Sequence, residues 1–195
     1  LALTQGPVKF AGGGDLGLFY QLATDGYDKL KPTQPIEDGL EISRRYLNAD
    51  NQPVSAVALG DVLQVLVTLR AHGNDDRQNI ALVDLLPGGF EVVPESVRVA
   101  AVPEERGSEE GAEGEGEVLP EVQDDGDGSV WQPQMVDARE DRVIAFGTVP
   151  TVAVTYRYKI KAVNAGQFTV PPAYAESMYE RSVKARGVVG QMEVK

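Results

Sequence analysis

The chain contains one imidazole, His72, which limits the catalytic chemistry that its residues can support. A Ser-His-Asp arrangement would need a serine such as Ser43, Ser55 or Ser96 beside that histidine. No serine lies in the Gly-x-Ser-x-Gly turn that exposes the nucleophile of many hydrolases. His72 belongs to the polar sequence His72-Gly-Asn-Asp-Asp76, which is typical of a surface turn. We therefore expect no catalytic residues, and the function predicted below is not that of an enzyme.

Metal and nucleotide sites are also not expected. Zinc would need several His or Cys ligands, and the chain has one histidine and no cysteine. The string Gly12-x-Gly14-x-x-Gly17 matches the dinucleotide-binding fingerprint, which requires a helix directly after the glycines. Here the segment 18–22 reads as a strand, so we interpret the glycines as a turn. We expect no cofactor.

The most acidic part of the sequence is residues 104–128, with 11 acidic residues, six glycines and Arg106 as its one base. It carries −10 of the net charge of −12. Its few apolar residues could not offset the entropy lost on ordering, so we predict a disordered, solvated loop. The alternative is an acidic docking arm for a basic partner. The glutamates at 104, 105, 109 and 110 imitate a catalytic carboxylate pair, but such a pair needs a rigid, partly dry site.

A calcium loop is a remote possibility at the end of this segment. Asp125-Gly-Asp-Gly-Ser129 is similar to the start of an EF-hand loop. The position that the motif reserves for glycine is Val130, and the position of the bidentate acid is Val136. The motif therefore fails, and we expect no bound calcium.

One acidic residue, Asp84, interrupts the apolar run Ile80–Leu86. A buried carboxylate needs a cation or several hydrogen-bond donors. The candidate partners are Arg44, Arg45, Arg139 and Arg142, and the sequence leaves the choice open. We predict a buried ion pair or a turn cap that fixes strand register.

Most of the remaining sequence has the two-residue period of β-strands. From Val152 to Ala162 the even positions are mainly apolar or aromatic, whereas Arg157, Lys159 and Lys161 lie on the opposite, solvated face. The segment 63–69 repeats this pattern, and Leu40, Ile42, Arg44 and Tyr46 repeat it more weakly. The nearly continuous run 80–86 indicates a central strand covered on both faces. We expect one turn of helix at 173–179.

These patterns predict an all-β protein, a two-layer antiparallel sandwich with at most one short helix. The segment Lys31-Pro-Thr-Gln-Pro35 reads as a stiff connector. We therefore predict terminal strands of a preceding domain at 1–30, a connector at 31–35, and one sandwich at 36–195 that contains the acidic loop.

The composition excludes several partners. The acidic balance argues against nucleic acid and against an anionic membrane. No apolar run approaches the ~20 residues of a membrane span, so we expect no insertion into a membrane. The chain begins at Leu1 without a signal segment, and we expect it to be a mature or excised piece of a longer protein.

Two long motifs resemble the C-terminal end of bacterial α2-macroglobulins. The first is Val83-Asp-Leu-Leu-Pro-Gly-Gly-Phe-Glu91, and the second is Gly166-Gln-Phe-Thr-Val-Pro-Pro-Ala-Tyr-Ala-Glu-Ser-Met-Tyr179 with Ala185-Arg-Gly187. The segments 42–46, 59–62, 139–143 and 154–162 are similar to other parts of the same region. The resemblance covers nearly the whole chain, in order.

The resemblance implies the last macroglobulin-like domain of a large periplasmic protein that traps proteases. Residues 1–30 would then be the end of a CUB-like domain. In thioester-bearing family members the reactive Cys-Gln pair and the protease bait region lie upstream of this domain. The family implies no catalytic residue here.

We therefore expect a non-catalytic protein-interaction domain in a periplasmic protease-trapping or envelope-defence assembly. Its partners would be other domains of the parent protein and another periplasmic or envelope protein. The features available to a partner are sheet edges, the 171–179 turn, and Trp131 if it is exposed, although Trp131 is more simply interpreted as the end of the core. The alternative function is a structural spacer or a carbohydrate-binding sandwich of a cell-surface protein.

Overall fold

A computed structural model describes Phe19, Gln21 and the residues 31–97 and 129–195. The chain divides into two units, Leu1–Leu30 and Lys31–Lys195, and the fold below is that of the second unit. The acidic segment 104–128, the glycines at 12, 14 and 17, and nearly all of the predicted terminal strands at 1–30 lie outside the described residues. The domain division given above therefore stays a prediction.

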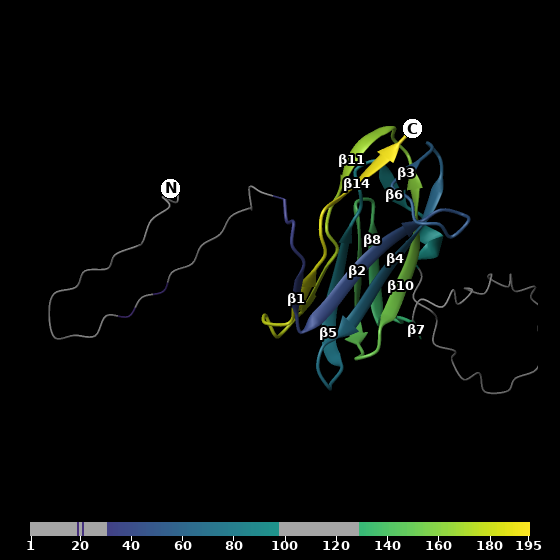
Figure 1. Ribbon diagram of the computed structural model, residues 1–195. Coiled ribbons are helices and arrows are strands. Elements are labelled where there is room, and N and C mark those ends of the chain that lie inside the picture. Colours follow the sequence, from purple (N-terminus) through teal and green to yellow (C-terminus); the bar gives the residue numbers. More distant parts are fainter. Residues whose placement is uncertain (1–18, 20, 22–30, 98–128) are drawn as a thin grey trace, which may run out of the picture. The chain divides into compact units, whose positions relative to one another are not determined.

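Two large sheets form the layers of a sandwich (Figure 1). The six-stranded sheet has the order β1-β13-β12-β5-β9-β8, with the strands β1 (Ile36–Asp38), β5 (Arg77–Leu85), β8 (Met135–Arg139), β9 (Arg142–Val149), β12 (Tyr174–Ser177) and β13 (Lys184–Arg186). The five-stranded sheet has the order β2-β4-β10-β6 with β7 beside β10, and consists of β2 (Leu40–Leu47), β4 (Val62–Ala71), β6 (Phe90–Val92), β7 (Ser129–Val130) and β10 (Val154–Ala162).

A third, small sheet joins β11 (Gly166–Val170), β14 (Gly190–Val194) and β3 (Ala56–Val57). Nearly all pairings are antiparallel; the parallel exceptions among the named strands are β7 with β10 and β14 with β3. The described helical structure is one short 3-10 turn, η1 (Pro94–Ser96). The prediction of an all-β antiparallel sandwich with at most one short helix is confirmed for the described residues. None of these residues forms a helix long and apolar enough to cross a membrane.

The core lies between the two large sheets, where alternate side chains of each strand point inward. On β4, Leu63, Val65, Val67 and Leu69 are almost completely buried, as their period predicts. On β10 the buried positions 154, 156, 158, 160 and 162 alternate with Arg157, Lys159 and Lys161. The predicted strand at 63–69 and most of the predicted strand at 152–162 are therefore confirmed.

The predicted helical turn at 173–179 is wrong. Residues 174–177 form strand β12, which lies between β5 and β13. Ala175 is fully buried, while Tyr174 and Ser177 are half-buried and Glu176 is exposed. A seven-residue segment is too short for a stable helix of its own, so the hydrogen bonds offered by two neighbouring strands decide its structure.

Two further expectations need correction. The two-residue period places Val152 on the buried face of a strand, but β10 begins at Val154 and Val152 is 62% exposed in the preceding turn. The run 80–86 does form a central strand, since β5 lies between β12 and β9. It is not equally covered on both faces, because Ile80, Leu82 and Asp84 are fully buried whereas the alternate positions 81, 83 and 85 are half-buried. Because the outward-facing residues 81, 83 and 85 are also apolar, the alternation of burial cannot be recognised in the sequence.

The turn after β5 contains a close contact that requires glycine. A Cβ atom at Gly89 would lie 2.3 Å from the Phe168 ring, whereas one at Gly88 would be 3.7 Å from it. We expect Gly89→Ala to lower the free energy of unfolding by about 1–3 kcal/mol, because the ring must shift. Gly88→Ala is the matched control and should change it by much less. Urea denaturation checks both, and equal effects of the two substitutions would contradict this account.

Candidate interaction site

A buried ion pair joins the two large sheets. Arg44 of β2 donates a hydrogen bond to Oδ1 of Asp84 on β5, and their side chains are 7% and 1% exposed. The hydroxyl of Tyr158 on β10 donates to the other carboxylate oxygen of Asp84, at 2.7 Å. Among the four arginines named from the sequence, Arg44 is thus the partner of Asp84. Three strands from both layers meet in this network, which therefore fixes how the layers are placed.

Burial governs the protonation of this network. It raises the pKa of Asp84, and the Arg44 charge and the Tyr158 hydrogen bond oppose that effect. Burial would lower the pKa of Arg44, but the charge and hydrogen bond of Asp84 together with Tyr46 and Tyr158 outweigh it, so the pKa of Arg44 is raised and the guanidinium stays charged. The pKa of Tyr158 is raised well above its ordinary value by burial and by Asp84, which keeps the hydroxyl protonated as a donor.

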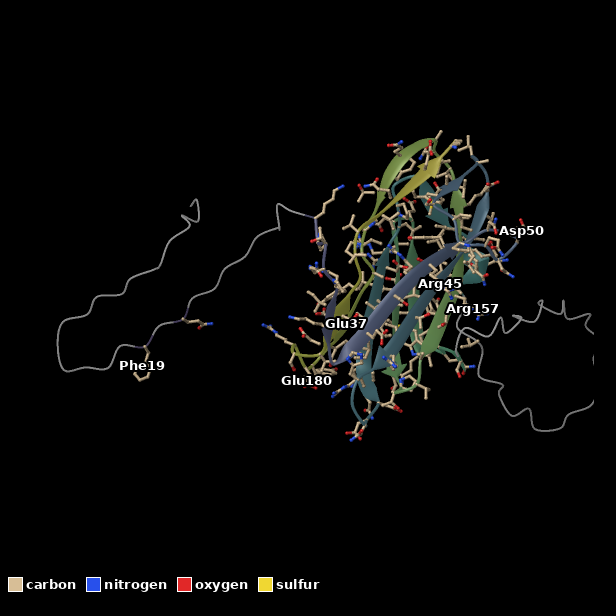
Figure 2. All side chains as sticks on the ribbon, in the orientation of Figure 1. Phe19, Glu37, Arg45, Asp50, Arg157 and Glu180 are labelled. Carbon is tan, nitrogen blue, oxygen red and sulfur yellow. The ribbon has the colours of Figure 1, made fainter. Side chains whose placement is uncertain are left out.

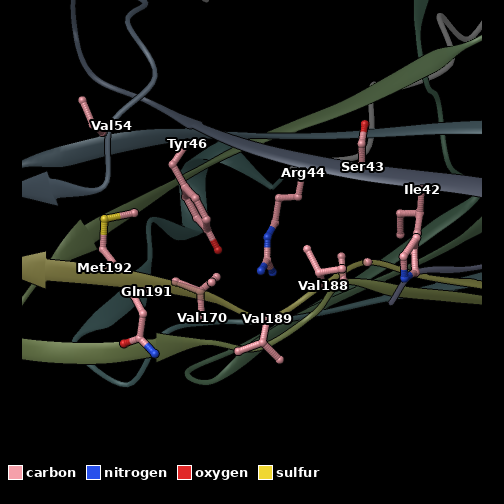
Figure 3. Close-up of a pocket in the computed structure, with 14 residues that line it drawn as sticks. Ile42, Ser43, Arg44, Tyr46, Val54, Val170, Val188, Val189, Gln191 and Met192 are labelled. Carbon is pink, nitrogen blue, oxygen red and sulfur yellow. The ribbon is translucent and has the colours of Figure 1, made fainter. Parts of the chain in front are cut away.

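Arg44 also forms part of a pocket of about 420 Å³ beside β2 (Figure 3). Its guanidinium donates to the backbone carbonyl of Pro171 and lies 5.1 Å from the centre of the Tyr46 ring. The rest of the lining is mainly apolar, with Val170, Val188, Val189 and Met192 among its members. Because Arg44 already has partners on three sides, the pocket offers shape and apolar surface rather than an unused charge.

The turn between β12 and β13 exposes large apolar side chains. Tyr179 is 80% exposed and Met178 is 54% exposed. The backbone N–H of Met178 donates to the carbonyl of Asn79 on β5. The turn that contains Val152 lies at the same end, because Thr151 donates to Asp76 in the turn just before β5. We call Val152, Met178 and Tyr179 the apolar end. The sequence identifies the 171–179 turn as a surface available to a partner, but the two-residue strand period wrongly places Val152 in the core.

His72 lies on the surface, as its turn sequence predicts. Its Nε2 atom is 3.6 Å from the Glu41 carboxylate, which also binds Arg70. Within the described part of the chain, His72 forms hydrogen bonds or ion pairs with Glu41, Gly39 and Arg77, and with no serine. The described residues also contain no group of three or more His, Cys, Asp or Glu side chains that could hold a metal ion.

Trp131 is part of the core and not an exposed anchor. It is 4% exposed, its indole N–H donates to the Thr148 carbonyl at 2.8 Å, and its ring meets Tyr156 edge to face. The interpretation of Trp131 as the end of the sandwich core is confirmed. Burial also removes the aromatic platform that carbohydrate binding would use at this position.

Comparison with known proteins supports the β-sandwich fold and shows that this chain corresponds to a small part of longer proteins. Residues 39–181 match the family model described as the bacterial alpha-2-macroglobulin MG10 domain. An alpha-2-macroglobulin of Rickettsia conorii is 40% identical over 91% of this chain, which covers 8% of that protein. The native Escherichia coli alpha-2-macroglobulin structure is 27% identical, with a TM-score of 0.66, over 87% of this chain and 10% of that one.

A second solved structure shows the Escherichia coli protein activated by porcine elastase. It is 27% identical with a TM-score of 0.64, and the match covers 87% of this chain and 14% of that one. The chain therefore spans about a tenth of the length of the proteins that it matches.

Proposed function

The chain belongs to the bacterial alpha-2-macroglobulin family, as a macroglobulin-like domain of such a protein, and we propose that it acts there as a non-catalytic interaction domain. Its apolar end would contact another domain of the parent protein. The observation that carries this proposal is the exposure of Tyr179, Met178 and Val152 at one end of the sandwich. The chain spans about a tenth of the length of its relatives, so a parent protein of that kind would contain further domains for this one to contact.

The composition of the apolar end fits a docking surface. Aromatic residues and methionine are enriched in protein interfaces. Without a partner, the consecutive Met178 and Tyr179 leave apolar area in contact with water. Hydrogen bonds from the backbone order the turn: the N–H of Ser177 donates to the Val183 carbonyl, and the N–H of Glu180 donates to the Ser177 hydroxyl. The two side chains are therefore presented on an ordered support, which lowers the entropy lost on docking.

A binding measurement tests the proposal. The chain and the remainder of its parent protein are produced separately and mixed in a calorimeter. We expect a complex, and we expect the double substitution Met178→Ala and Tyr179→Ala to weaken it at least about tenfold, because central aromatic anchors dominate interface energies. The melting temperature of the double variant should stay within about 2 °C of the parent chain, because the changed side chains are exposed.

Leu59→Ala is the matched control. Leu59 is 55% exposed but lies next to Gly60 and the end of β10, at the opposite end of the sandwich. It should leave binding unchanged. The absence of a complex, or equal affinities for the wild-type chain and the double variant, would contradict the proposed docking surface.

We further propose that the parent protein is a periplasmic protease trap. The support is the family and the related Escherichia coli protein, whose solved forms include one activated by porcine elastase. When the full-length parent is mixed with elastase, the elastase should afterwards cleave casein more slowly but still cleave a small chromogenic peptide. Cell fractionation should recover the parent in the periplasm. Unchanged casein cleavage, or recovery in the cytosol, would contradict these two parts of the proposal separately.

A further inference from the structure

The outward side of the six-stranded sheet, away from the core, carries a continuous apolar patch. Because Ile80, Leu82 and Asp84 of β5 are buried toward the core, the alternate residues of β5 and of its neighbours point outward. The pairing registers align six apolar side chains in two adjacent rows across β12, β5, β9 and β8: Tyr174, Val83 and Ile144 in one row, and Ala81, Phe146 and Met135 in the other. We call these six residues the outer patch.

Every residue of the outer patch keeps some exposed surface. Five of the six are half-buried, and Met135 on the edge strand β8 is 54% exposed. The side chains shield one another within the plane of the sheet, so their upper surfaces together form one apolar area. Contiguous exposed apolar areas of this kind mark sites of interaction.

The row that contains Tyr174 continues onto β13 at Arg186, a cation without a counter-ion. Arg186 is in register with Tyr174 on one side and with Ile36 of β1 on the other. It forms no hydrogen bond or ion pair with any described residue, and its Nε atom is buried without a partner. Buried polar atoms nearly always have a partner, so this arginine is not explained by the fold of the domain alone.

The carboxylates near Arg186 are placed to serve other groups. Asp38 and Glu176 are both in register with Lys184, the preceding outward residue of β13. Glu176 also accepts a hydrogen bond from the neighbouring tyrosine hydroxyl at 2.6 Å. Glu37 of β1 is one residue out of phase with this face and points to the opposite side of the sheet (Figure 2). The guanidinium of Arg186 is therefore available to an anion from outside the domain.

We propose that the outer patch and Arg186 bind a segment from another domain of the parent protein, in which a carboxylate side chain lies beside apolar residues. The apolar side chains of that segment cover the outer patch. Its carboxylate accepts hydrogen bonds from the Nη groups of Arg186, which suit a planar, two-oxygen acceptor. This inference rests on the proposal that the chain acts inside a larger protein, but it concerns a surface other than the apolar end.

The size of the outer patch favours a covalently linked partner over a second copy of this chain. Two rows of residues across four strands cover about 300 Å² at the usual strand spacing and rise. A stable complex of independent molecules buries about 800 Å² on each partner. A segment of the same protein needs less area, because the covalent linkage raises its effective concentration.

Photo-cross-linking in the full-length parent tests this inference. Benzoylphenylalanine is introduced at Val83, in the centre of the outer patch, and in a second variant at the exposed Met135, where the fold tolerates a large side chain. Mass spectrometry identifies the cross-linked peptides. We expect both probes to react within one molecule, with a segment of another domain that contains an aspartate or glutamate among apolar residues.

Charge reversal assigns the role of Arg186. Arg186→Glu should lower the cross-link yield at least about fivefold, because it places two carboxylates together. Reversing the partner's carboxylate to lysine in the same protein should restore the yield. Lys161→Glu, at an exposed position on the other large sheet, is the control and should leave it unchanged. Because Arg186 has no partner among the described residues, its substitution should leave the melting temperature within about 2 °C.

Several outcomes would overturn the inference. These are cross-links to a second copy or to this domain itself, the absence of a cross-link from both probes, and equal effects of Arg186→Glu and Lys161→Glu. The proposed contact of the apolar end is tested separately by Met178→Ala with Tyr179→Ala. If that double substitution weakens binding while the outer patch gives no cross-link, the apolar end is the docking surface and the outer patch is not.

Discussion

Asp84→Ala should lower the free energy of unfolding by about 3–5 kcal/mol, because it leaves the buried Arg44 guanidinium without its counter-ion. The loss includes the hydrogen bond from Tyr158. For a chain of this length the melting temperature should fall by roughly 10 °C. Differential scanning calorimetry of the purified chain measures it directly.

The control for this prediction is a surface ion pair on the same large sheet. Asp137 of β8 lies 2.9 Å from Arg139, and both side chains are largely exposed. Asp137→Ala should change the free energy of unfolding by less than about 0.5 kcal/mol, since an exposed pair is screened by water and salt.

A double substitution separates the charge effect from a packing effect. Replacing Arg44 by Met and Asp84 by Leu in one chain removes both charges and keeps apolar volume, so it should recover much of the stability lost in Asp84→Ala. Tyr158→Phe should cost about 1–2 kcal/mol, because one donor to the carboxylate is removed. A melting temperature that Asp84→Ala leaves unchanged would refute the structural role of the pair.

Trp131→Ala should destabilise the chain by a similar amount, about 3–5 kcal/mol, through a large cavity at the edge of the core. The indole packs edge to face on Tyr156 with ring centres 6.1 Å apart. It also approaches the backbone closely, since a Cβ atom at Gly147 would lie only 3.1 Å from the indole. Strands β9 and β10 both pack on the indole, through Gly147 and Tyr156, so their backbones would have to move to close the cavity. Urea denaturation gives the free energy of unfolding.

Trp131→Phe distinguishes the ring from its N–H. It keeps most of the apolar volume but leaves the Thr148 carbonyl without its donor, so we expect an intermediate loss of about 1–3 kcal/mol. Val130→Ala changes the adjacent residue, which is 49% exposed, and should have little effect. Equal stabilities of Trp131→Ala and Val130→Ala would show that the indole does not support the core.

Whether a residue stands at an odd or an even position along its strand was enough to predict much of this structure. The alternation on β4 and β10 predicted which side chains are buried, because successive strand residues point to opposite faces. The same parity placed Arg44 with Leu40 and Ile42, and would have separated it from Arg45. It failed at Val152, where apolar character continues past the end of the strand, and at 174–177, where a short segment takes its conformation from its neighbours.

The sequence by itself determined the class of fold, the position of the long strands β4, β5 and β10 to within three residues, and the need of Asp84 for a cation. These properties depend on the local period of apolar residues and on the cost of burying a carboxylate, and both can be evaluated from neighbouring residues. Only the tertiary structure decided that Arg44 and Tyr158 meet Asp84 and that Met178, Tyr179 and Val152 share one end. Each of these depends on which strands pair and in which register, and residues far apart in the chain carry no local signal of that choice.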